Sequence, residues 1–218
     1  MLVEKVHAIY SKYCSNQLRQ RPALWQAIRE YQSRSKSTGA KPTTLWQLYS
    51  NVVKVKPEHI LECGTGLSTI VIAEAINEIK SHDAAYSPSF VSLENAEYYF
   101  EHAVEILPKK YDGQVDILYR PREKKEFGLF RGYVYTDKPD IPFDFVFIDG
   151  PNYDDHYGTT FCADAVELSL NNPEARIRGI IDTRVSTCFV MQEMYGRNSV
   201  GYSRWRRYGW FDVCGEPK

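Results

Sequence analysis

The spacing of hydrophobic residues indicates helices in the first part of the chain. Apolar residues recur at the three- and four-residue spacing of one helix face within 2–13, 24–31 and 45–53. We expect three helices here, the third following Pro42 with a threonine as its cap. These helices should form an N-terminal extension, residues 1–55, packed on the core of the protein.

From residue 59 onward, short apolar runs alternate with helical patterns, which is typical of parallel strands joined by crossover helices. The expected strands are 59–63, 90–93, 114–119, 143–148 and 177–182. The fold class is therefore α/β, with a Rossmann-like, mostly parallel sheet and helices on both faces. We expect the sheet and its helices to form one domain, residues 56–218.

Three further segments complete the expected order of elements. Asn95 can cap a helix that ends at Leu107, and 161–170 shows another amphipathic pattern. The segment after Gly196 is rich in aromatic and β-branched residues, which indicates a terminal antiparallel hairpin. Residues 120–141 mix basic residues, glycines and prolines without a clear period, so we expect a long loop or insertion there.

The composition is that of a globular domain without strong charge. The chain has 218 residues, of which 43% are hydrophobic, enough for one sizeable core. Its 27 basic and 28 acidic side chains nearly cancel, so there is no overall attraction to nucleic acid or to an anionic membrane. Its cysteines show neither zinc-ligand spacing nor a disulfide framework, and no apolar run could span a bilayer. We therefore expect a cytoplasmic protein that does not associate with membranes.

A glycine-containing turn follows the first expected strand. Gly64 and Gly66 stand between the apolar run ending at Cys63 and a helix that begins near Leu67. Glycine lets a cofactor lie against the backbone at the helix N-terminus, and Ser68 can add a hydroxyl contact. The turn is therefore predicted to bind a nucleotide-like cofactor.

Two neighbouring residues indicate which cofactor the turn would bind. Thr69 stands where a dinucleotide-binding fingerprint has its third glycine, and Glu62 precedes the first glycine by two positions. An acid beside the turn would repel a pyrophosphate, whereas it suits a cofactor with an ammonium group and a sulfonium. S-adenosylmethionine (SAM) carries both.

Two more acids end expected strands. Glu94 ends the second, where its carboxylate can accept hydrogen bonds from both ribose hydroxyls; alternatively, its charge only favours the start of the next helix. Asp149 follows 143–148 and would lie at the crevice above the sheet, where such folds bind ligands; alternatively, it begins a turn with Gly150. His156, in the polar stretch that follows, could act as a general base, although a solvated loop explains it equally well.

In this order, the glycine turn with Glu62, the strand-end Glu94 and the segment 143–150 resemble the class I SAM-dependent methyltransferases, over about residues 43 to 195. The resemblance implies a seven-stranded sheet whose last strand is antiparallel, and methyl transfer by in-line attack on the sulfonium. We expect SAM to contact the following residues: Glu62, Gly64, Gly66, Ser68, Glu94 and Asp149.

Within that class, the strand ends look most like the small O-methyltransferases of the catechol type, some of which need a divalent cation. Asp149 and Asp182, which ends the next strand, match acids of that family, and two carboxylates could hold magnesium. Thr183 and Asn152 stand where that family has an asparagine and its catalytic lysine, so we do not favour a metal and assign no metal ligands. The expected catalytic residues are Asp149, Asp182 and His156.

The function expected from these features is methyl transfer to a small-molecule acceptor, with oxygen as the acceptor atom by resemblance. A non-catalytic or divergent Rossmann-fold nucleotide-binding protein remains open, as does an NAD-dependent dehydrogenase, against which Glu62 and Thr69 argue. The basic and aromatic segment 204–208 could bind nucleic acid, but one face of a hairpin explains it, so nucleic acid is not expected. An exposed face of the N-terminal helices could support a homodimer.

Overall fold

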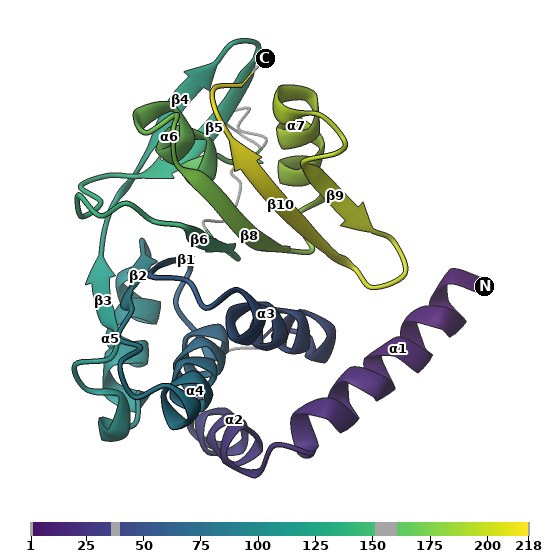
Figure 1. Cartoon of the computed structure of the whole chain (residues 1–218), viewed down its shortest axis with the longest axis vertical. Coiled ribbons are helices and arrows are strands. Elements are labelled where there is room, and N and C mark those ends of the chain that lie inside the picture. The colour runs from purple at the N-terminus through teal and green to yellow at the C-terminus, as the bar shows by residue number, and fades with distance from the viewer. Residues whose placement is uncertain (1, 36–39, 151–160, 218) are drawn as a thin grey trace.

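The computed structural model describes residues 2–35, 40–150 and 161–217, and a seven-stranded sheet forms its centre (Figure 1). The strands lie in the order β3-β2-β1-β6-β8-β10-β9, and β10 runs antiparallel to both of its neighbours. Their bounds are β1 His59–Cys63, β2 Ser89–Glu94, β3 Asp116–Tyr119, β6 Phe145–Ile148, β8 Arg176–Asp182, β9 Val200–Ser203 and β10 Tyr208–Cys214. The expected fold class, with its terminal antiparallel hairpin, is confirmed.

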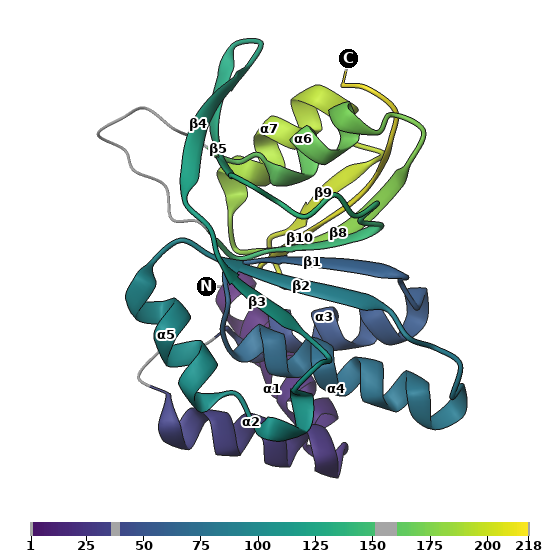
Figure 2. The same cartoon turned by 90° about the vertical axis from the view of Figure 1, so that its left-hand side faces the viewer.

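Helices cover both faces of this sheet. Figure 2 shows the sheet nearly edge-on, with α1 to α5 on one side and α6 and α7 on the other. The bounds are α1 Leu2–Arg19, α2 Pro22–Arg34, α3 Pro42–Val55, α4 Leu67–His82, α5 Glu97–Ile106, α6 Asp164–Asn171 and α7 Val185–Tyr195, with a short 3-10 turn at Lys109–Tyr111. None of the helices in the part of the chain that the structure describes is long and apolar enough to cross a membrane.

The strands contribute side chains to two separate hydrophobic cores, because successive side chains point to opposite faces of the sheet. Phe145 and Phe147 of β6 join the core formed with α2, α3 and α4. Val146 and Ile148 of the same strand join the core formed with α6 and α7. Burial on both faces explains why these strands have continuous apolar sequences.

Of the long loop or insertion expected at 120–141, the loop is wrong, because most of this segment is a hairpin. Strand β4, Arg122–Phe127, pairs antiparallel with β5, Phe130–Tyr135, and β5 also pairs with the short strand β7, Phe161–Cys162. The sequence hides β4 because its four central residues are charged and exposed. The charged side chains leave no apolar alternation to detect.

Two expected helix starts also differ. The third helix begins at Pro42 with Lys41 as its cap residue, so its threonines lie inside the helix and do not cap it. The helix expected from Asn95 has Ala96 as its cap residue, and the Glu94 carboxylate accepts the backbone N–H groups of both residues. A strand-end acid therefore replaces the expected asparagine cap.

The basic and aromatic turn between β9 and β10 holds α1 against the body of the protein. The His7 ring lies 3.1 Å from the Trp205 carbonyl oxygen, and the Arg206 guanidinium lies 5.0 Å from the centre of the Tyr10 ring. Arg207 and Glu4 form an ion pair. The side chains of Arg206 and Arg207 and the backbone of Trp205 are thus engaged within the protein itself.

Candidate functional site

The glycine turn lies where the ends of three parallel strands meet. Gly64 donates its backbone N–H to the Leu93 carbonyl at the end of β2, and the N–H groups of Asp149 and Gly150 both donate to the Cys63 carbonyl. Gly64 has φ of +98°, and it approaches Gly150 too closely for a side chain at either position. Packing of the chain on itself therefore requires glycine at position 64.

The residue that replaces a third glycine has a defined role in this turn. The Thr69 hydroxyl accepts the Gly66 N–H at 3.0 Å and donates to the Glu62 carboxylate at 2.6 Å. Ser92 donates to the same Glu62 oxygen at 2.6 Å. No atom lies within 4 Å of the place where a side chain at Gly66 would begin, so the turn borders open space on this side.

Glu62 is fully buried beneath the turn. Burial raises its pKa to about 7, although the hydroxyl groups of Ser68, Ser92 and Thr69 lower it. Neither Glu62 nor Ser68 is among the residues that line the cavity above the turn. The Glu62 carboxylate therefore orders the turn through hydrogen bonds made on the side away from the cavity. A direct contact between Glu62 and a cofactor stays a prediction.

A cavity of about 330 Å³ opens above the turn at the carboxyl ends of β1, β2 and β6. Its lining residues are Gly64, Thr65, Glu94, Asn95, Ala96, Tyr99, Arg122, Tyr135, Asp149 and Gly150. The turn and two of the strand-end acids predicted from the sequence thus meet at one cavity. Crevices at this edge of a parallel sheet are where such folds bind ligands.

Glu94 accepts backbone hydrogen bonds at the start of the next helix and also lines the cavity. Its Oε1 accepts the N–H groups of Asn95 and Ala96 at 2.8 and 2.9 Å, and its Oε2 accepts the Thr65 N–H at 3.3 Å. Burial raises its pKa, and the three backbone donors oppose that shift. The carboxylate is held by the backbone on one side while it lines the cavity on the other.

The β4–β5 hairpin supplies cavity residues that the sequence did not indicate. Tyr135 and Arg122 line the cavity. The backbone N–H of Tyr135 donates to the buried Asp164 carboxylate at 2.9 Å, and Lys138 lies 2.9 Å from the same carboxylate. The Tyr135 hydroxyl is buried and has no hydrogen-bond partner among the described residues. A bound molecule could therefore satisfy it.

The two later strand-end acids lie side by side. Ile148 of β6 pairs with Ile181 of β8, so Asp149 and Asp182 follow neighbouring positions of adjacent strands. Burial and the charge of Asp182 raise the pKa of Asp149, although 34% of the Asp149 side chain is exposed. Asp182 does not line the cavity, so only Asp149 of this pair borders it.

The surroundings of this acid pair include residues that sequence reasoning missed. The Arg184 guanidinium donates to the Asp149 carbonyl and lies 3.9 Å from its carboxylate. Asp182 accepts hydrogen bonds from the buried Thr44 of α3 and, at 3.3 Å, from Thr183. No sequence motif links Thr44 to Asp182, since 138 positions separate them.

The described residues do not offer a suitable set of ligands for a divalent cation. Within 2–35, 40–150 and 161–217, no group of three or more His, Cys, Asp or Glu side chains could hold a metal. The acid pair is accompanied by the Arg184 guanidinium and by hydrogen bonds from the Thr44 and Thr183 hydroxyl groups. His156 and Asn152 lie outside the described residues.

Solved structures with the same fold are methyltransferases. An O-methyltransferase from Bacillus cereus, in complex with S-adenosylhomocysteine (SAH), has a TM-score of 0.56 and 18% identity over 96% of this chain and 98% of that chain. The O-methyltransferase TomG from Streptomyces achromogenes, in complex with SAM, has a TM-score of 0.55 and 16% identity over 99% of both chains. SAH-bound PaMTH1 from Podospora anserina has a TM-score of 0.52 and 19% identity over 83% of this chain and 70% of that chain.

Comparisons by sequence give no match, either to a protein-family model or to a curated protein. At these low identities, the structural likeness establishes the fold and no more. The chain has the fold of the SAM-dependent methyltransferases, as its strand-end motifs indicate.

Proposed function

We propose that this protein is a SAM-dependent methyltransferase that binds its cofactor in the cavity above the Gly64–Gly66 turn. The observation that carries the proposal is Glu94, a buried carboxylate that ends β2 and lines this cavity. A carboxylate at this position can accept hydrogen bonds from two ribose hydroxyls. The open space beside Gly66 gives the rest of the cofactor room against the backbone.

In this proposal, SAM supplies a methyl group on a positively charged sulfur. The acceptor oxygen forms a bond to the methyl carbon while the carbon–sulfur bond breaks, and the bonding electrons stay on the sulfur of SAH. The acceptor hydroxyl must lose its proton, and Asp149 borders the cavity with a raised pKa that suits a proton acceptor near neutral pH. Asp182 acts through Asp149 by raising that pKa.

The proposed reaction does not need a metal. Arg184 places a positive charge 3.9 Å from the Asp149 carboxylate. A guanidinium has a permanent charge and can stabilise the negative charge that develops on an acceptor oxygen. We therefore propose Arg184 as the cation of this site.

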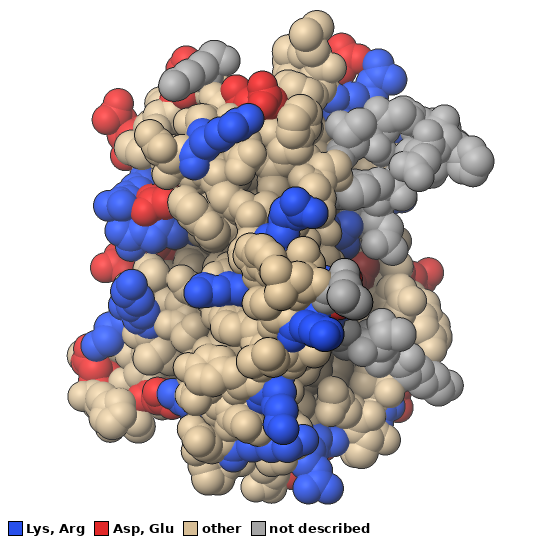
Figure 3. Space-filling view, turned by 90° about the vertical axis from the view of Figure 1, so that its right-hand side faces the viewer, with Lys and Arg blue, Asp and Glu red and all other residues tan. Residues whose placement is uncertain are grey.

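The proposed acceptor is a small molecule, with oxygen as the acceptor atom. The best candidate for a nucleic-acid contact, the segment 204–208, is engaged with α1 through Trp205, Arg206 and Arg207. Figure 3 shows that Lys and Arg on this side of the molecule form several groups, some of them beside Asp and Glu, and not one continuous stripe. A duplex or a single strand would be better matched by a continuous basic stripe.

Calorimetry with SAH tests the proposal. The wild type should bind one SAH per chain, and Glu94→Ala should weaken binding by roughly tenfold to a hundredfold, the range for hydrogen bonds to a charged group. Glu97→Ala is the matched control, because Glu97 is exposed in the first turn of α5 and lies outside the cavity. Glu94→Gln, which keeps an acceptor for the Asn95 and Ala96 N–H groups, separates lost binding from lost folding.

The results separate this function from its alternatives. A folded wild type that does not bind SAH would refute the methyltransferase function. If it bound a nicotinamide cofactor instead, the dehydrogenase would be favoured. If Glu94→Ala bound SAH as tightly as the wild type, the assignment of Glu94 to the cofactor site would be refuted, whereas the methyltransferase function would not.

We also propose a cytoplasmic location and leave a homodimer as a prediction. All five cysteines are free, which is typical of a reducing compartment.

On α1, the side chains of Leu2 and Ile9 are 69% and 71% exposed, and Tyr13 lies on the same helix face. This apolar face supports the homodimer, and light scattering after gel filtration would test it.

A further inference from the structure

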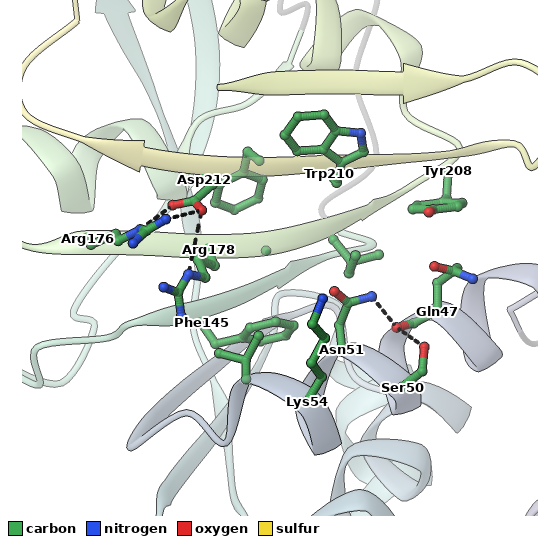
Figure 4. Close-up of a pocket in the computed structure, with 14 residues that line it drawn as sticks. Gln47, Ser50, Asn51, Lys54, Phe145, Arg176, Arg178, Tyr208, Trp210 and Asp212 are labelled. Atoms are coloured by element: carbon green, nitrogen blue, oxygen red, sulfur yellow. Dashed lines mark hydrogen bonds and ion pairs between the residues drawn. The ribbon is translucent and has the colours of Figure 1, made fainter. Parts of the chain in front are cut away.

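A second, larger cavity lies beside the sheet, away from the proposed SAM site. Its volume is about 690 Å³, and it shares no lining residue with the cavity above the glycine turn. Figure 4 shows it between α3 and the strands β8 and β10. Pockets for small molecules commonly measure about 300–1,000 Å³, so the volume suits a ligand of that kind.

The alternation of side chains along β8 and β10 gives this cavity a polar and aromatic lining. Arg178 and Ile180 of β8 and Trp210 of β10 face the cavity. Residues of the same strands that point the other way, such as Ile181 and Val213, enter the core on the other face of the sheet.

Trp210 forms an aromatic wall that is held in place by its neighbour. A side chain on Gly201 of β9 would begin only 2.5 Å from the indole nitrogen, so the indole lies directly over this glycine. The Trp210 side chain is nevertheless 38% exposed. Phe145 and Ile180 add a buried apolar floor. A planar ring could stack on the indole and cover both surfaces.

The charged end of the cavity has an excess of positive charge. Arg176 makes two hydrogen bonds of 2.6 Å to the Asp212 carboxylate, and Arg178 lies 3.6 Å from the same group. Lys54 of α3 points into the cavity (Figure 4) and forms no ion pair with any residue that the structure describes. Three cationic side chains therefore line the cavity with one carboxylate.

We infer that this cavity binds a small planar aromatic anion, with its ring against Trp210 and its acidic group at Lys54. The ring would cover the exposed indole, and the acidic group would balance the excess positive charge. Asn51 of α3, which lines the cavity beside Lys54 (Figure 4), can orient a polar substituent. This inference does not depend on the proposed methyltransferase function.

Fluorescence titration with 1-anilinonaphthalene-8-sulfonate, an aromatic anion, tests the inference on the full chain. The probe should bind at one saturable site, and Lys54→Glu should weaken binding by roughly tenfold or more. Trp210→Val, which removes the ring but suits a strand, should weaken it by roughly threefold or more. Lys109→Glu is the matched control, since Lys109 is exposed and lines neither cavity. The affinity of Lys109→Glu for the probe should equal that of the wild type.

A neutral relative of the probe, N-phenyl-1-naphthylamine, distinguishes a site that recognises the anionic group from nonspecific binding to a hydrophobic surface. It should bind at least about tenfold more weakly than the sulfonate to the wild type, and Lys54→Glu should not weaken it further. Equal binding of the two probes, or equal behaviour of Lys54→Glu and Lys109→Glu, would overturn the inference. Circular dichroism of each variant ensures that only folded proteins are compared.

Discussion

Gly64 and Gly150 meet at the ends of β1 and β6, so closely that a Cβ atom on Gly64 would lie 2.9 Å from the backbone nitrogen of Gly150. This contact brings the glycine turn and the Asp149–Gly150 strand end to one cavity. The spacing of the two loops thus depends on two residues without side chains.

Gly64→Ala should destabilise the protein, whereas Gly66→Ala should not. Position 64 combines φ of +98° with the contact to Gly150, so we expect a loss of about 2 kcal/mol or more in the free energy of unfolding. Gly66 has extended backbone and open space beside it, so its variant should fold normally but bind SAH more weakly. Urea unfolding and calorimetry measure the two effects, and equal stability of the two variants would contradict the packing argument.

Glu62→Gln should change how stability depends on pH. Because the pKa of Glu62 rises to about 7 on folding, the folded protein binds more protons than the unfolded chain between pH 4.5 and about 7. The contribution of Glu62 to stability is therefore fully present below about pH 4.5 and is lost as the pH rises to about 7. The wild type should lose up to about 3 kcal/mol more than Glu62→Gln across this range. Parallel pH profiles for the two proteins would show that Glu62 is not responsible.

Thr44→Val and Thr43→Val should have different effects although both threonines are fully buried. The Thr44 hydroxyl donates to Asp182, and its loss should cost about 1–2 kcal/mol in the free energy of unfolding. The Thr43 hydroxyl has no hydrogen-bond partner in the described part of the chain, so valine should be neutral or slightly stabilising there. Urea titration at pH 7 compares the pair, and a larger loss for Thr43→Val would contradict the assigned contact.

Tyr135→Phe should weaken SAH binding without a loss of stability. The hydroxyl is buried and has no partner among the described residues, so its removal costs the ligand-free protein nothing. If the hydroxyl donates to the cofactor, binding should fall by roughly three- to tenfold, as for one neutral hydrogen bond. Calorimetry and thermal melting of the same samples provide both values. Unchanged affinity would remove Tyr135 from the proposed binding site.

Arg184→Ala should make the acid pair responsive to magnesium. Without the guanidinium, Asp149 and Asp182 face each other without a nearby cation, and Tm should fall by roughly 3–6 °C. Millimolar magnesium should then raise the Tm of the variant, while magnesium and EDTA leave the wild type unchanged. A wild type whose Tm rises with magnesium and falls with EDTA would indicate a metal site in place of the arginine.

The strands of the central sheet were predictable because burial on both faces requires continuous apolar runs. The bounds of β1 agree with the expected 59–63 at both ends. Strand β4 carries four exposed charged residues in a row, so its pairing with β5 could not be inferred from a pattern of burial. Its strand conformation depends on a tertiary contact that no local pattern records.

The candidate site was predictable only where it depends on strand ends. Glu94 and Asp149 follow apolar runs, and the topology brings such positions together. Tyr135 comes from the hairpin that was expected to be a loop, and Thr44 reaches Asp182 across 138 positions. Contacts of this kind depend on the packing of α3 and the hairpin, which periodicity does not specify.

The attachment of α1 has a consequence for the order in which the chain is completed. His7 contacts Trp205 across 198 positions, and Glu4 reaches Arg207 across 203. During synthesis, α1 is therefore made well before the β9–β10 hairpin on which it docks. Until the hairpin is made, the first turns of α1, which carry Glu4 and His7, have no native surface to pack against. Such a late, long-range closure is expected to form slowly and to open before the sheet does.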